Sequence, residues 1–224
     1  MTHTLLLVGS PRGRMSSSTS LSNYLSNKLQ EKGEAHETLW ITEQLVSQDR
    51  TKKMLEAIRT ADNIVLTAPL YDDCQPYNVT KTMELAAEMG DLQGKRFIPI
   101  VNCGFPQVEQ ITLGVMPIYK MFAKKTGMVW GGSLAIGGGE GIQGSAGKTL
   151  EDIGGAGNSI IAELQKIAEA ITTDTSYKDI EVITFPKFLL QPWLGGLMMW
   201  INNRNWNTMA KKNGEKVDAQ PYAK

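Results

Sequence analysis

Cysteine and histidine are scarce in this sequence, and neither is arranged as a metal site. The chain has two cysteines in 224 residues, Cys74 and Cys103, with no C-x-x-C pair, and two histidines with no H-E-x-x-H pattern. This disfavours a disulfide framework, a structural zinc site and a cysteine-ligated cluster. We therefore expect no metal ligands, and reduced thiols in a cytoplasmic protein.

An excess of charge and a long apolar run are also missing. Lys plus Arg equals Asp plus Glu at 23 each, so the net charge does not indicate nucleic acid, an anionic membrane or acidic steering of a partner. The most apolar segment, residues 188–201, has 14 residues and contains Pro192, whereas a membrane span needs about 20. The N-terminus has no basic segment followed by an apolar stretch, so we expect no secretory signal.

Residues 4–20, TLLLVGSPRGRMSSSTS, are the most informative stretch. A short apolar run is typical of a strand buried on both faces, and it is followed by a loop rich in Gly, Ser and Arg and then by a helical pattern. Such a loop can hold a phosphate at a helix N-terminus. The alternative is an ordinary N-cap, which needs only one hydroxyl. We predict that the phosphate site is formed by Ser10, Arg12, Ser16, Ser17 and Ser18.

The rest of the chain alternates strands and helices, which predicts a parallel sheet with helices on both faces. Further strands are expected at 36–41, 62–69, 96–102 and 128–136, and helices at 49–60, 76–89, 107–125 and 148–173. We predict a flavodoxin-like three-layer α/β sandwich with a five-stranded parallel sheet of order 2-1-3-4-5. The expected domains are residues 1–185 and a C-terminal helical arm, 186–224.

The loops after the first and third strands should meet at the switch point of this sheet, where ligands bind. We therefore expect Pro69, Leu70, Tyr71, Asp72 and Cys74 to contact the ligand, although these residues could instead form a simple turn-rich connection. Asn102 and Gly104 lie in another small-residue loop, where the fourth strand ends. A G-x-G-x-x-G match at 139–144 lies outside the first βα turn, and the Walker-like run 141–149 has the wrong glycine spacing, so neither indicates a nucleotide site.

Two of these segments together resemble the NADPH-dependent FMN reductases and the multimeric flavodoxin-like NAD(P)H oxidoreductases. GSPRGRMSSSTS is similar to the family's G-S-x-R-x-x-S at Gly9, Ser10 and Arg12, with Ser16 one position beyond the motif's last Ser. APLYDDCQPYNVTKTMELA matches P-x-Y-x-x-x-x-P with a following Lys and acid at Pro69, Tyr71, Pro76, Lys81 and Glu84. The resemblance covers residues 4–147. It implies an FMN whose phosphate lies on the first loop and whose isoalloxazine edge lies along residues 69–75. Residues 102–105, which include Asn102 and Gly104, would form a third wall, and residues 137–141 would lie nearby.

The resemblance also implies an activity. It predicts that NADPH or NADH reduces the flavin, which passes electrons to a small acceptor such as a quinone or free flavin. The cysteine cluster of the iron–sulfur relatives is missing, and Cys103-Gly104-Phe105 stands where the family usually has a Gly-Gly pair. Two alternatives stay open: a flavodoxin-type electron carrier without nicotinamide activity, and a non-redox phosphate-binding interaction module. No catalytic acid or base is assigned.

The C-terminal arm has apolar residues that need a partner surface. Trp193, Met198, Met199 and Trp200 lie close together in it. The arm could dock on its own domain, cover the active site or contact another subunit, and we favour a homo-oligomer formed through it. Contact with nucleic acid or a membrane is not expected, an interfacial anchor being the minor alternative.

Overall fold

The computed structural model describes residues 2–142, 149–184, 192–216 and 218. Contacts within the chain divide it into two compact units, Met1–Thr184 and Phe185–Lys224. Each unit is described below by itself.

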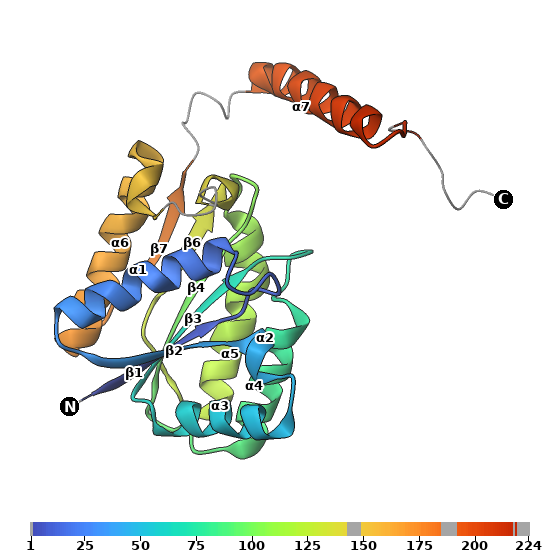
Figure 1. The fold of residues 1–224 in the computed structure, drawn as a ribbon. Coiled ribbons are helices and arrows are strands. Elements are labelled where there is room, and N and C mark those ends of the chain that lie inside the picture. Colours follow the sequence, from blue (N-terminus) through green and yellow to red (C-terminus); the bar gives the residue numbers. More distant parts are fainter. Residues whose placement is uncertain (1, 143–148, 185–191, 217, 219–224) are drawn as a thin grey trace. The chain divides into compact units, whose positions relative to one another are not determined.

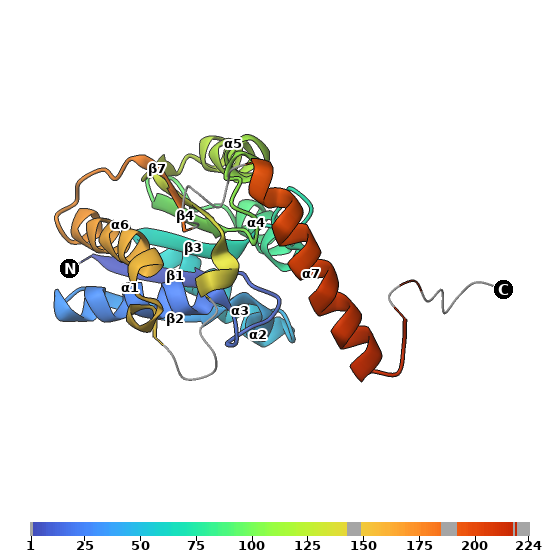
Figure 2. The same cartoon turned by 90° about the horizontal axis from the view of Figure 1, so that it is seen from above.

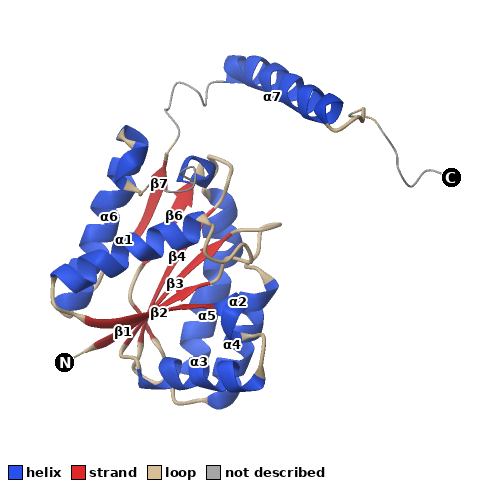
Figure 3. Ribbon diagram, in the orientation of Figure 1, coloured by secondary structure: helices blue, strands red, loops and turns tan. Residues whose placement is uncertain are grey.

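The first unit contains one sheet in which every paired strand is parallel (Figures 1 and 3). The order along the sheet is β2-β1-β3-β4-β6-β7, and the short β5 pairs with the beginning of β4. The predicted doubly wound arrangement and the order of the first four strands are therefore confirmed. The strands are β1 (His3–Val8), β2 (Ala35–Trp40), β3 (Asn63–Pro69), β4 (Arg96–Asn102), β5 (Val129–Trp130), β6 (Ser133–Gly137) and β7 (Asp179–Ile183).

Helices cover both faces of the sheet, with α1 and α6 on one face and α4 and α5 on the other (Figure 2). A π-helical turn, Gln110–Val115, leads into α5, and 3-10 turns lie at Gly139–Ile142 and Glu151–Ile153. The helices of this unit are α1 (Ser17–Glu31), α2 (Ile41–Gln44), α3 (Gln48–Thr60), α4 (Tyr77–Met89), α5 (Met116–Thr126) and α6 (Gly155–Thr172).

Alternating residues of the central strands fill two separate cores. In β1, Leu5 and Leu7 belong to the core under α3, α4 and α5, whereas Leu6 belongs to the core under α1 and α6. All three side chains are buried. Burying one such side chain contributes about 1.5–3 kcal/mol, so β1 and β3, which are buried on both faces, fix the centre of the sheet.

The prediction of five strands is wrong, because the described part of the sheet has seven. The segment expected as one strand, 128–136, is interrupted at Gly131 and Gly132. A Cβ on Gly131 would lie 2.6 Å from side-chain atoms of Arg96 and Ile98, and Gly132 has a φ of +95°. The sequence did not suggest the other additional strand, β7, because it is a short edge strand with partly exposed residues.

The second unit contains one described helix, α7 (Pro192–Lys212). It has no acidic residue, and its cations are Arg204, Lys211 and Lys212. Met199 and Trp200 are exposed in it, as are Ile201, Trp206 and Met209, whereas the side chains of Trp193 and Met198 lie outside the described residues. Within the described ranges, every helix is too short or too polar to cross a bilayer.

Candidate functional site

A hollow lies at the carboxyl ends of the central strands, where the loops after β1, β3 and β4 meet. Its empty space is about 510 Å³, a volume that includes the open mouth. Every residue predicted for the site lines it, except Asp72 and Cys74. The lining consists of Ser10, Arg12, Ser16, Ser17, Ser18, Pro69, Leu70, Tyr71, Asn102, Cys103, Gly104 and Gly139.

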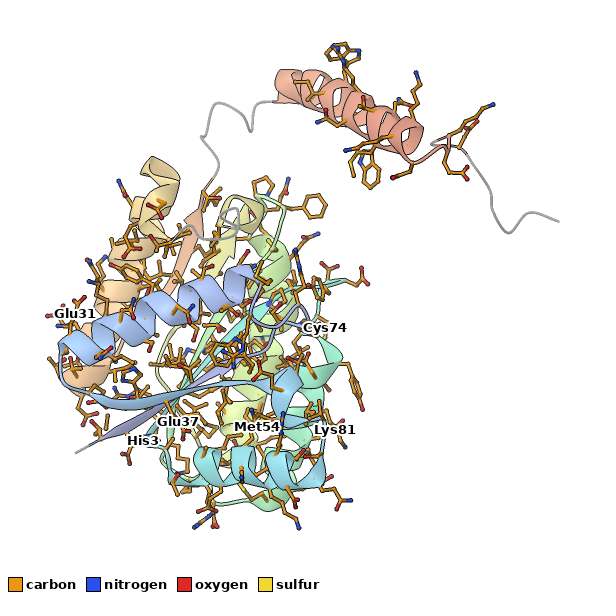
Figure 4. The ribbon with its side chains drawn as sticks, viewed as in Figure 1. His3, Glu31, Glu37, Met54, Cys74 and Lys81 are labelled. Carbon is orange, nitrogen blue, oxygen red and sulfur yellow. The ribbon has the colours of Figure 1, made fainter. Side chains whose placement is uncertain are left out.

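Asp72 and Cys74 do not line the hollow because the chain forms a tight hairpin after β3. The backbone N–H of Tyr71 donates to the carbonyl of Cys74 at 2.9 Å, and the N–H of Cys74 donates back at 3.0 Å. Asp72 and Asp73 form the turn with φ angles of +48° and +60°. Figure 4 labels Cys74 on the loop that leads into α4, on which Lys81 is also labelled. Lys81 pairs with Glu84 on the exposed surface of α4 at 3.5 Å.

The loop after β1 begins at a point where only glycine fits. A Cβ on Gly9 would lie 2.4 Å from Cγ2 of Val79 and 3.2 Å from Cβ of Ala68. The N–H of Gly9 donates to the carbonyl of Thr67 at 2.8 Å, and Nδ2 of Asn78 donates to the carbonyl of Gly9 at 3.0 Å. The start of the loop is therefore bound to both β3 and α4.

Ser16 ends this loop as the N-cap of α1. Its Oγ accepts from the N–H of Thr19 at 3.2 Å and donates to the carbonyl of Gly13 at 2.8 Å. The first turn of α1 contains no acidic residue. Within the described part of the chain, the N–H groups of Ser17 and Ser18 have no hydrogen-bond acceptor. These donors carry the positive end of the helix dipole, so this end of α1 can bind an anion.

The hydroxyl groups of the first turn bind the neighbouring loops. Ser17 Oγ donates to the carbonyl of Gly139 at 3.2 Å, and Ser18 Oγ donates to Oδ1 of Asn102 at 3.1 Å. The groups left to bind an anion are therefore the backbone N–H groups, the Arg12 guanidinium and the Ser10 hydroxyl. The hydroxyls of Ser17 and Ser18, which were predicted from the sequence as phosphate ligands, thus donate to the protein itself, and the phosphate site stays a prediction.

The two arginines of the loop have different surroundings. Arg14 binds both carboxylate oxygens of Glu43, at 2.7 and 3.0 Å, and hydrogen bonding to Glu43 raises the pKa of Arg14. Arg12 lines the hollow and forms no ion pair with any residue that the structure describes. Among the described residues, no Asp or Glu belongs to the lining, in which Arg12 is the charged side chain.

The third wall consists of the end of β4 and the segment after β6. The N–H of Gly139 donates to the carbonyl of Cys103 at 2.6 Å, and a Cβ on Gly139 would lie 3.1 Å from Nδ2 of Asn102. Cys103 is buried, and this burial raises the pKa of its thiol, so the thiol is protonated at neutral pH. Cys103 and Gly139 were not among the predicted site residues, although both lie in loops that the sequence placed near the site.

Metal ligands do not gather anywhere in the described ranges, where no three His, Cys, Asp or Glu side chains form a group that could hold an ion. Of the G-x-G-x-x-G match, Gly139 takes part in the wall of the hollow, and residues 143 and 144 lie outside the described residues.

Solved structures share this fold. No protein-family model matches the sequence, and no curated protein matches it. A WrbA-like flavodoxin from Agrobacterium tumefaciens aligns over 79% of this chain and all of its own, with a TM-score of 0.52 and 12% identity. A flavodoxin from Streptococcus pneumoniae aligns over 78% of this chain and all of its own, with a TM-score of 0.53 and 15% identity.

A third solved structure is an FMN-dependent NADH-azoreductase from Bacillus anthracis in complex with FMN. It aligns over 76% of this chain and all of its own, with a TM-score of 0.54 and 13% identity. At such identities these likenesses concern the fold alone. The first unit of this chain therefore has the predicted flavodoxin-like fold.

Proposed function

We propose that the chain is an FMN-dependent NAD(P)H oxidoreductase that passes electrons to a small acceptor such as a quinone or free flavin. The observation that carries this proposal is that Arg12, Ser17 and Ser18 line the same hollow. The N–H groups of Ser17 and Ser18 have no acceptor among the described residues. The hollow lies at the switch point of a flavodoxin-like sheet, where ligands bind in this fold. The FMN-bound azoreductase of the same fold supports the choice of ligand.

The residues present fit the parts of FMN. Arg12, the Ser10 hydroxyl and the first N–H groups of α1 would bind the phosphate, because all of them are donors and no carboxylate lines the hollow. Pro69, Leu70 and Tyr71 would lie along the edge of the ring system, and Asn102 and Gly104 would form the third wall. Asp72 and Cys74 remain predicted contacts beyond the lining.

Bound FMN would supply the hydride and electron chemistry, and the protein would bind, orient and enclose it. Tyr71 and Phe105 are 45% and 68% exposed on the loops that surround the hollow. Their rings offer an aromatic surface beside the hollow for a planar nicotinamide or acceptor. Among the described residues the lining contains no carboxylate, histidine or lysine, and we assign no catalytic acid or base.

We also propose a cytoplasmic homo-oligomer formed through the arm, residues 186–224. The support is the exposed apolar surface of α7, which includes Trp200 and Trp206. Light scattering should give an oligomer mass for the wild type and a smaller mass for the double variant Trp200→Ser/Trp206→Ser. A monomeric wild type would contradict this part of the proposal.

Spectroscopy and rapid mixing test the activity. The purified protein should have flavin absorption or should acquire it on addition of FMN. Stopped-flow mixing with NADPH or NADH should then bleach that absorption at least as fast as the enzyme turns over in the steady state. A colourless protein without affinity for FMN would contradict both flavoprotein functions. Flavin binding with negligible reduction by either nicotinamide would identify an electron carrier instead.

A further inference from the structure

Trp40 connects the end of β2 to the loop after β1. Its indole Nε1–H donates to Oγ1 of Thr19 at 3.0 Å, although the two residues are 21 positions apart. Thr19 lies in the first turn of α1 and is buried. A side chain from a neighbouring strand is therefore bonded to the helix end at which the proposed phosphate site lies.

The hydroxyl of Thr19 also binds the backbone in the middle of the loop, at Gly13. Thr19 Oγ1 accepts from the indole of Trp40, and its hydroxyl donates to the carbonyl of Gly13 at 2.9 Å. Ser16 Oγ donates to the same carbonyl at 2.8 Å and lies 3.1 Å from Thr19 Oγ1. Gly13 has a φ of +57°, which glycine adopts readily, and its carbonyl accepts from both hydroxyls.

Arg14 covers the indole from the solvent side. Its guanidinium carbon lies 3.8 Å from the centre of the Trp40 ring, and its nitrogens bind both carboxylate oxygens of Glu43. The Arg14 side chain is 61% exposed, so the ion pair alone contributes little to stability. Stacked on the ring, however, it restricts the indole to the orientation that reaches Thr19.

We infer that Trp40 is a positioning residue for the anion site, held by Arg14 and acting through Thr19. This inference rests on the proposed function for the identity of the ligand. Trp40 fixes the loop and the N-cap before an anion arrives, so that binding does not have to order them. The two arginines would therefore have different roles. Arg14 stacks on Trp40 and binds Glu43, whereas Arg12 is available to bind the phosphate.

The variant Trp40→Phe tests this role because it keeps an aromatic ring and removes the indole N–H. The matched control is Trp130→Phe, which removes an indole N–H that donates to Asp179 at 2.8 Å, on a strand that pairs with the beginning of β4. Both apoproteins are titrated with FMN and with riboflavin, which lacks the phosphate. We expect Trp40→Phe to bind FMN about fivefold more weakly and riboflavin as tightly as the wild type does. Trp130→Phe should match the wild type for both ligands.

Hydrogen exchange without ligand tests the same inference independently of FMN. The N–H of Gly13, which donates to the carbonyl of Ser10, and the N–H of Thr19, which donates to Oγ of Ser16, should exchange faster in Trp40→Phe than in Trp130→Phe. If Trp40→Phe does not fold, Thr19→Val replaces it, since it removes the hydroxyl that receives the indole bond. Where both single variants fold, the double variant Trp40→Phe/Thr19→Val should lose no more FMN affinity than the weaker-binding single variant does.

The outcomes separate this inference from the proposed function. If Trp40→Phe equals the control in FMN affinity and in exchange, or weakens FMN and riboflavin equally, the positioning role is wrong. If the wild type binds neither flavin while loop exchange still depends on Trp40, the proposed function fails and the positioning of the loop stands.

Discussion

Ser18 Oγ donates to Oδ1 of Asn102 at 3.1 Å, and this bond joins the start of α1 to the end of β4 at the wall of the hollow. Both side chains are buried, at 1% and 7% exposure. Ser18→Ala should lower the free energy of unfolding by about 1–3 kcal/mol, because it leaves a buried acceptor unpaired. Urea denaturation measures this change.

Ser22→Ala is the matched control in the same helix. Ser22 is fully buried, and its hydroxyl finds no hydrogen-bond partner among the residues that the structure describes. Its removal should leave stability unchanged or raise it, since alanine also has the higher helix propensity. An equal decrease in the free energy of unfolding of both variants would mean that the hydrogen bond between Ser18 and Asn102 does not stabilise the fold.

Ser16→Asp should weaken FMN binding by at least about tenfold. Aspartate can still accept from the N–H of Thr19 as an N-cap, although it cannot donate to the carbonyl of Gly13 as the Ser16 hydroxyl does, and the new negative charge lies beside the proposed phosphate. Ser47→Asp is the control, because Ser47 caps α3 in the same way, accepting from the N–H of Arg50 at 3.4 Å. Fluorescence titration should show unchanged FMN affinity for Ser47→Asp; a similar affinity for Ser16→Asp would place the phosphate elsewhere.

Asp73→Gly should stabilise the hairpin after β3. Asp72 and Asp73 both have positive φ angles, and the pair of turn residues favoured there is Asp-Gly. The gain should be about 0.5–1 kcal/mol, since glycine relieves the strain but has more freedom in the unfolded chain. Asp49→Gly, in the first turn of α3, should instead lose stability, and thermal unfolding of both variants provides the comparison.

Asp179 should make stability sensitive to acid. Burial opposes its charge, but hydrogen bonds from Lys120, Trp130 and Ser133 outweigh burial and lower the pKa of Asp179. A carboxylate whose folded pKa lies below its unfolded value of about 3.9 contributes stability above that value, and this stability is lost as the pH falls through the folded pKa.

Asp179→Asn removes this contribution. At pH 7 the variant should unfold at a lower urea concentration than the wild type. This difference in urea midpoint should become smaller as the pH falls from 4 to 2. Glu56→Gln is the control, because Glu56 pairs with Arg59 on the fully exposed surface of α3, where solvent screens the charge. A difference for Asp179→Asn that is constant with pH would contradict the account.

The buried strands could be predicted from the sequence because their signal is local. The run Leu5–Val8 is apolar without alternation, as expected of a strand covered on both faces, and the sheet buries it in this way. The interruption at Gly131 and Gly132 could not be predicted, since it depends on contacts with Arg96 on another strand and with the backbone of Tyr177.

The residues predicted for the site lie around one hollow except for Asp72 and Cys74, but the contacts of each side chain could not be predicted from the sequence. Arg12 and Arg14 are equivalent cations in the sequence, and what distinguishes them is Trp40 and Glu43, which only the fold brings to Arg14. Similarly, the serine hydroxyls resemble phosphate ligands until Gly139 and Asn102 are seen to accept from them.

Fluorescence titration of the apoprotein with FMN and riboflavin tests the central claim, that the hollow binds FMN by its phosphate. The wild type should bind FMN more tightly than riboflavin. Arg12→Gln should lose at least about tenfold in FMN affinity and nothing in riboflavin affinity, whereas Arg59→Gln, on the surface of α3, should change neither. Equal affinity of the wild type for the two flavins, or an unchanged affinity of Arg12→Gln for FMN, would contradict the claim.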